Sequence, residues 1–199
     1  MRGKLLVGVV VLWAVAVVGG MAMLADYKYR PGARADEQPL WPADSKLARG
    51  RAVPTLVMFA HPKCTCTRAS LTELAELMAE ARGNVRAHVV FMKPSEQDGD
   101  WAHSDTWDQA REIRGVEVSI DVDAAEAHRF GAQTSGQVVL YGVDGRLLYA
   151  GGITSARGHV GTSIGHRRLL ALLTHRATDA HTGNVYGCAL AEREKDAPR

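Results

Sequence analysis

Apolar residues first appear in this chain as one long uncharged run. The run covers residues 5–24, LLVGVVVLWAVAVVGGMAML, and matches the length that a helix needs to cross the hydrocarbon core of a bilayer. Arg2 and Lys4 precede it, and the positive-inside rule places such basic flanks in the cytoplasm. We therefore expect a single-pass transmembrane anchor after a cytoplasmic terminus of residues 1–4, with the remaining chain exported. A cleaved signal peptide is the alternative, although its apolar region typically spans only about 7 to 15 residues.

The pattern then becomes polar and irregular. Residues 25–51 combine prolines and glycines with charged side chains and show little apolar periodicity. We expect this segment to be a linker.

From residue 53 the pattern is typical of an α/β domain. The run VPTLVMFA at 53–60 predicts a buried strand, and residues 67–82 carry apolar side chains at helical spacing. A second strand is expected at 85–92. A strand, a helix and a further strand in this order indicate a right-handed parallel crossover.

The second half adds an antiparallel pair. Strands at 137–141 and 146–150 flank Asp144-Gly145, a dipeptide that favours a tight hairpin. The other expected elements are a helix at 106–114, a strand at 116–121, a helix capped by Asp123 and ending at Phe130, and a last helix at 164–176. We therefore predict an α/β domain over residues 52–177 with a mixed central sheet, followed by a tail at 178–199.

The composition of the chain limits the classes of function that it can have. At 199 residues, less the anchor and the linker, the chain has room for one domain. The net charge is only +2 and no basic stripe is present, which argues against a nucleic-acid partner. Three cysteines are too few for a disulfide scaffold, and Cys64 and Cys66 lie one residue apart. This spacing points to redox chemistry or metal binding.

Two segments carry a family resemblance, VMFAHPKCTCTRASL at the first strand and helix, and GQVVLYGVDGRLLYAGG at the hairpin. Together they resemble the thioredoxin-like superfamily. The resemblance implies a three-layer thioredoxin-like fold and thiol–disulfide exchange with the thiols or disulfides of other proteins. By position it implies that Cys64 attacks substrate disulfides and that Cys66 resolves the mixed disulfide, without a cofactor.

The physical setting of Cys64 supports the attacking role. At a helix N-terminus, unpaired N–H groups and the positive end of the helix dipole favour thiolate over thiol. Lys63 and His61 would add positive charge nearby. We expect a lowered pKa for Cys64.

The chain departs from the family pattern twice. Only Thr65 separates the two cysteines, where family members with this activity have two residues. Gly136 stands where the family has a cis-proline that pairs with the substrate backbone. Substrate docking must therefore differ.

Other functions compete for the same cysteines. A copper-binding protein or metallochaperone is the main alternative, because thiolates bind Cu(I), and His61 or His159 would complete the site. A peroxiredoxin needs a Thr before its cysteine, a place that Pro62 and Lys63 fill. The remaining alternative is that the two cysteines have no chemical role and lie on a domain that only binds a partner.

Cys188 lies in the tail, where apolar residues return after a polar stretch. We favour the reading in which Cys188 is a partly buried small hydrophobe that helps to hold the tail on the domain. In the alternative, the tail folds over the cysteine turn and Cys188 is a third redox cysteine.

The predicted transmembrane anchor indicates the localisation. We expect the chain in the inner, cytoplasmic membrane, with the soluble domain in the periplasm or another extracytoplasmic space.

Overall fold

The structure is a computed structural model that describes residues 2–176 and 181–191. Contacts divide the chain into two units, with the division between Arg30 and Pro31. Residue 177, at the end of the predicted domain, and the parts of the predicted tail at 178–180 and 192–199 lie outside the described residues.

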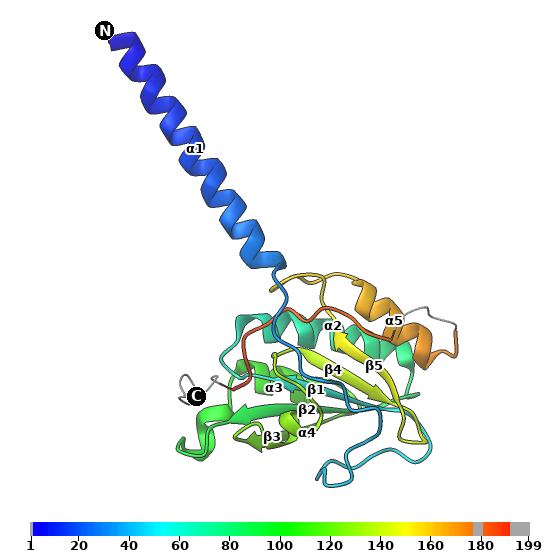
Figure 1. Cartoon of the computed structure of the whole chain (residues 1–199). Coiled ribbons are helices and arrows are strands. Elements are labelled where there is room, and N and C mark those ends of the chain that lie inside the picture. The colour runs from blue at the N-terminus through cyan, green and yellow to red at the C-terminus, as the bar shows by residue number, and fades with distance from the viewer. Residues whose placement is uncertain (1, 177–180, 192–199) are drawn as a thin grey trace. The chain divides into compact units, whose positions relative to one another are not determined.

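The first unit is one helix, α1 (Arg2–Tyr29) (Figure 1). The 27 residues of Gly3–Tyr29 are long and apolar enough to cross a membrane, by length and composition, and are not buried within the protein. The helix extends beyond the predicted residues 5–24 because its hydrogen-bond ladder meets no proline before Pro31.

The second unit is built on a five-stranded sheet with the order β3-β2-β1-β4-β5. β1 is parallel to β2 and β2 to β3, whereas β4 is antiparallel to both β1 and β5. The strands are β1 (Thr55–Ala60), β2 (Arg86–Lys93), β3 (Val116–Val122), β4 (Gln137–Tyr141) and β5 (Leu147–Gly152). The predicted α/β fold with a mixed sheet is confirmed.

The central strand β1 explains why its sequence reads as an unbroken apolar run. All six of its residues are buried, and they alternate between the two faces of the sheet. Leu56 and Met58 join the core on one face, and Val57 and Phe59 join the core on the other. A strand covered on both faces needs apolar residues at every position.

Helices cover both faces (Figure 1). The larger core lies under α2 (Thr65–Ala81), α3 (Asp105–Glu112) and α5 (Ile164–Leu173), and the short 3₁₀ helix η1 (Gly99–Ala102) lies in the loop that leads to α3. The other face carries one short helix, α4 (Ala125–Arg129), and irregular chain completes its cover.

The segment at 31–51 packs on the domain, whereas a linker was expected. The ring of Trp41 lies edge-on to those of Phe130 and Tyr141, with centroids 4.9 Å and 5.3 Å away. The Tyr141 hydroxyl donates to the carbonyl of Gln38 at 2.9 Å. The compact unit therefore begins near Pro31. Its contacts depend on single aromatic and backbone groups, which leave no periodic pattern in the sequence.

The helix after β3 is not capped at Asp123 as predicted, because its N-cap residue is Ala124. The buried carboxylate of Asp121 accepts the N–H groups of Glu126 and Ala127 at 2.8 Å and 2.9 Å. Asp123 instead adopts a left-handed backbone (φ 55°) and accepts the N–H of Ser95. The prediction that Asp123 caps the helix was wrong, because Asp121 accepts the N–H groups of the first helical turn.

Candidate active site

Cys64 lies where β1 has ended and α2 begins. It is the N-cap residue, with an extended backbone (φ −93°, ψ 119°), and its carbonyl accepts the N–H of Thr67 at 3.0 Å. Cys66 lies in the first turn of the helix. The two residues are 3% and 7% exposed. Both cysteines thus occupy the helix start that the sequence predicted.

Polar groups approach the Cys64 thiol from two elements and lower its pKa. These groups are the backbone N–H groups of Cys66 and Thr67 in α2, and the thiol and the N–H of Cys188 in the tail. Burial alone would raise the pKa of the Cys64 thiol. These polar groups outweigh burial and hold that pKa below its ordinary value, which is the predicted direction, although the thiol of Cys188 contributes more to the lowering than either N–H group of the helix start does.

Cys66 is less acidic. Burial raises the pKa of its thiol, and the neighbouring Cys64 raises it further through charge and a hydrogen bond. The N–H of Gly158 and the charge of Arg157 oppose this. Both belong to the glycine-rich loop after β5, where His159 is exposed. The loop borders the cysteine turn, and Cys64 is the more readily ionised of the pair.

The tail brings the third cysteine to the site. Val185 and Leu190 are 0% and 2% exposed and dock the tail, whereas Cys188 between them is exposed. The reading of Cys188 as a partly buried hydrophobe was therefore wrong, because its neighbours provide the packing. Desolvation, the hydrogen bond to Cys64 and the charges of Cys64 and Cys66 raise the pKa of Cys188 to about 12.

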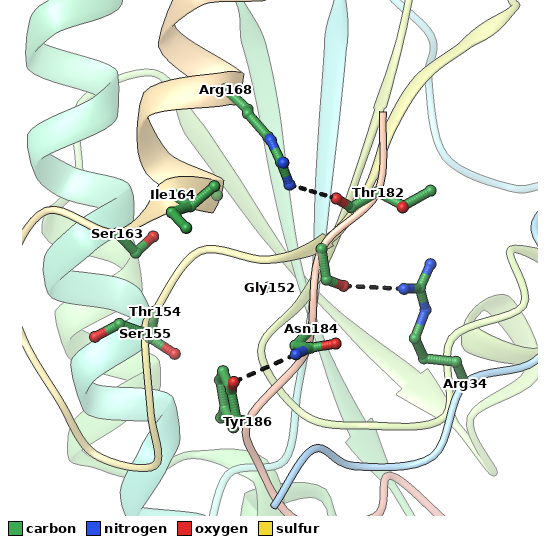
Figure 2. Close-up of a pocket in the computed structure, with 12 residues that line it drawn as sticks. Arg34, Gly152, Thr154, Ser155, Ser163, Ile164, Arg168, Thr182, Asn184 and Tyr186 are labelled. Carbon is green, nitrogen blue, oxygen red and sulfur yellow. Dashed lines mark hydrogen bonds between the residues drawn. The ribbon is translucent and has the colours of Figure 1, made fainter. Parts of the chain in front are cut away.

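Two arginines hold the tail further upstream (Figure 2). Arg34 donates to the carbonyl of Gly183 at 3.0 Å, and Arg168 of α5 donates to the carbonyl of Thr182 at 2.7 Å. These residues line a pocket of about 340 Å³ at the start of α5. The tail is thus fixed both to α5 and to the segment at 31–51.

Ser135 links the tail to the cysteine turn, and sequence reasoning missed it. Its Oγ accepts the N–H of His61 at 2.9 Å and shares a hydrogen bond with the Thr67 hydroxyl at 2.9 Å. Its own N–H donates to the carbonyl of Cys188 at 2.8 Å. Gly136 follows with φ 86°, and the described residues contain no cis peptide bond. The only signal in the sequence was the position of Ser135 beside the missing proline.

Lys63 and His61, which we expected to add positive charge, lie at the edge of the site. The Lys63 ammonium lies 4.3 Å from the ring centroid of Trp101, and the His61 ring packs edge-on against the same ring at 5.7 Å. Burial, followed by the charge of Lys63, lowers the pKa of His61. The positive charge that acts on Cys66 comes instead from Arg157, which the sequence did not identify.

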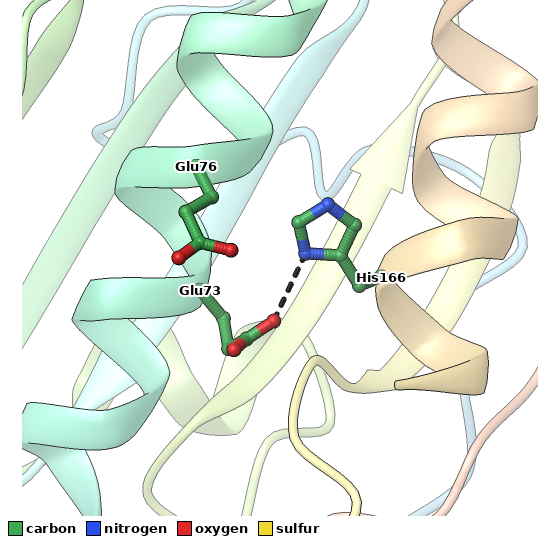
Figure 3. Close-up of side chains that lie close together, drawn as sticks. All are labelled: Glu73, Glu76 and His166. Carbon is green, nitrogen blue, oxygen red and sulfur yellow. Dashed lines mark hydrogen bonds and ion pairs between the residues drawn. The ribbon is translucent and has the colours of Figure 1, made fainter. Parts of the chain in front are cut away.

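One group among the described residues has the geometry of a metal site, and it is not the cysteines. Ligand atoms of Glu73, Glu76 and His166 lie within 4.8 Å of one another (Figure 3). His166 Nδ1 lies 3.1 Å from the buried Glu73 carboxylate, and its Nε2 lies 3.4 Å from that of Glu80. Both ring nitrogens thus face carboxylates, so the group acts as a buried polar link between α2 and α5.

No family model and no curated protein matches the chain. Among solved structures, a hypothetical protein from Sinorhizobium meliloti is 18% identical, with a TM-score of 0.60 over 83% of this chain and 96% of that one. An uncharacterized conserved protein from Geobacillus kaustophilus is 18% identical, with a TM-score of 0.59 over 84% and 95%. The exposed lipoprotein thioredoxin Etrx1 from Streptococcus pneumoniae is 17% identical, with a TM-score of 0.47 over 70% and 99%.

These likenesses concern the fold. The strand order β3-β2-β1-β4-β5, with a cysteine at the start of the first crossover helix, is thioredoxin-like, as the sequence resemblance implied. The activity must be argued from the site.

Proposed function

We propose that this chain is a membrane-tethered thiol–disulfide oxidoreductase that acts on the thiols or disulfides of other proteins through Cys64 and Cys66. The observation that carries the proposal is the environment of the Cys64 sulfur at the start of α2. Polar groups of the helix start and of the tail lower the pKa of Cys64 and so favour its thiolate, and the thiolate is the nucleophile in disulfide exchange.

The reaction has two steps. The Cys64 thiolate attacks one sulfur of a substrate disulfide, forms a mixed disulfide and releases the other substrate sulfur as a thiolate. A second thiol of the site then attacks the Cys64 sulfur and releases the remaining substrate thiolate. The site loses two electrons to the substrate, and the reverse sequence oxidises a substrate dithiol. The family resemblance assigns the second step to Cys66, whose thiol lies near that of Cys64.

The apolar helix α1 supports the tethering, and the basic residues before it support an exported domain. We place the domain on the outer side of the inner membrane, in the periplasm or another extracytoplasmic space, where disulfides persist. The test is a reporter enzyme that is active only in the cytoplasm, fused after residue 191. We expect this fusion to be inactive. An active fusion would contradict this orientation.

The activity is tested with the full chain in detergent and a protein disulfide as substrate. Cys64→Ser should abolish disulfide reduction, whereas Ala79→Ser, at an exposed position of the same helix, should leave it unchanged. Equal activity of wild type and Cys64→Ser would contradict the proposal. Bound copper measured in the same sample tests the alternative, because stoichiometric copper without exchange activity would favour a metal-binding role for Cys64, Cys66 and His61.

A further inference from the structure

Disulfide exchange needs two cysteines, and this site contains three. We propose that Cys188, rather than Cys66, is the disulfide partner of Cys64, an inference that rests on the proposed function. The tail would then be part of the active site.

The tail reaches Cys64 in a fixed register. It pairs antiparallel with the chain just before β4: Ser135 donates to the carbonyl of Cys188 at 2.8 Å, and Leu190 donates to the carbonyl of Gln133 at 2.9 Å. A slip by one residue would turn the Cys188 side chain to the other side and expose Leu190. The buried Leu190 therefore specifies the register that keeps Cys188 beside Cys64.

Gly187 allows this close approach. A Cβ at this position would lie 1.9 Å from the carbonyl oxygen of Ser135, so no other residue fits without displacing the tail. The carbonyl of Gly187 accepts a hydrogen bond from Arg157 at 2.5 Å, which ties the tail to the loop beside Cys66. The tail is thus held on both sides of Cys188.

Cys66 is less suited to pair with Cys64. The two thiols lie near each other, but only Thr65 separates the residues, so a disulfide between them would close a small ring. A disulfide between them would strain the first turn, in which Thr67 donates to the Cys64 carbonyl at 3.0 Å. The Cys66 sulfur is also held by the N–H of Gly158. Cys188 lies outside the helix, so it can approach Cys64 without unwinding it.

The pKa of Cys188 changes as the reaction proceeds. The charge of the Cys64 thiolate contributes to its high pKa, after desolvation and the hydrogen bond between the two residues. When Cys64 enters the mixed disulfide, that charge and that hydrogen bond are lost, so Cys188 ionises more easily. Its thiolate then attacks the Cys64 sulfur, breaks the mixed disulfide and releases the substrate thiolate. The product is a Cys64–Cys188 disulfide.

The tail also controls access. Cys64 is only 3% exposed, whereas Cys188 beside it is exposed. In the proposed reaction, the tail strand moves aside to admit the substrate disulfide to Cys64. When the strand pairs again before β4, it returns Cys188 to the mixed disulfide.

The test combines peptide mapping with an aromatic disulfide whose released thiol is coloured. The full chain in detergent is oxidised, digested and analysed by mass spectrometry. Wild type, Cys66→Ser and Cys188→Ser are each reduced and treated with the aromatic disulfide. Release of the first coloured thiol reports attack by Cys64, and release of the second reports resolution.

We expect a dominant Cys64–Cys188 peptide in the oxidised wild type, a measurement that does not depend on any variant. Cys66→Ser should release the second thiol as wild type does, whereas Cys188→Ser should stop with an adduct on Cys64. A dominant Cys64–Cys66 peptide, with stalling of Cys66→Ser instead, would overturn the inference and leave the proposed function intact. No adduct on Cys64 in the Cys188→Ser variant, with no disulfide turnover by wild type, would contradict the proposed function itself.

Discussion

The docking of the tail can be tested by adding a single methyl group at Gly187. A Cβ at Gly187 would lie 1.9 Å from the Ser135 carbonyl oxygen, and real Cβ contacts are essentially never shorter than 3.0 Å. In Gly187→Ala the tail must therefore move away by at least about 1.1 Å. The obstacle is backbone, which cannot rotate aside as a flexible side chain would.

The size of the effect follows from the bonds that this shift breaks. Ser135 donates to the tail at Cys188, and Arg157 donates to the carbonyl of Gly187. Each hydrogen bond contributes a net stabilisation of about 0.5–1.5 kcal/mol, so the loss of both costs the docked tail about 1–3 kcal/mol. The docked population, relative to the undocked one, should fall about 5- to 150-fold.

The assay is the fraction of Cys64–Cys188 disulfide formed by the full chain in a fixed glutathione buffer. That fraction should fall in Gly187→Ala. Gly99→Ala is the matched control, because a Cβ at Gly99 meets nothing within 4 Å and its backbone is not left-handed. Equal disulfide formation in Gly187→Ala and wild type would refute the docking register.

Three further predictions concern the rest of the domain. Removal of residues 1–29 should release a soluble, folded domain, and an aggregated product in fractionation and circular dichroism would contradict the boundary near Pro31. Trp41→Ala should lower the free energy of unfolding by about 2–3 kcal/mol in denaturant titrations, because the half-buried ring packs on Phe130 and Tyr141. An unchanged midpoint would mean that the segment at 31–51 is a free linker. Glu73→Gln should lower that free energy by about 1–3 kcal/mol, since it weakens the buried contact with His166, and unchanged stability would contradict that contact.

Local patterns predicted the elements that depend on local physics. The apolar run of β1 and the helical spacing of α2 were visible because a doubly covered strand and an amphipathic helix each impose a period on the sequence. The place of Cys64 at the helix start followed from the order of those two elements. The hairpin followed from Asp144-Gly145, where Gly145 adopts the left-handed conformation (φ 81°).

Contacts between distant segments were not predictable in the same way. Ser135 joins the cysteine turn to Cys188 through hydrogen bonds that span much of the chain, and no spacing in the sequence records them. Arg157 resembles any other loop arginine until the loop is placed beside Cys66. The segment at 31–51 packs through isolated residues such as Trp41, so its proline-rich composition indicated a linker. The sequence thus predicted the position of Cys64 at the helix start, and the structure identified what surrounds it.

The most direct test of the central claim is the pH dependence of alkylation of each cysteine, followed by mass spectrometry on the full reduced chain. The midpoint of each curve reports ionisation, whereas burial changes only the absolute rate. Because the polar groups around it lower the pKa of Cys64, this residue should become reactive at a lower pH than a free cysteine, whose pKa is about 8.5. Cys66 should follow above that value, and Cys188 should follow with a pKa of about 12. Reaction of Cys66 or Cys188 at lower pH than Cys64 would contradict the account.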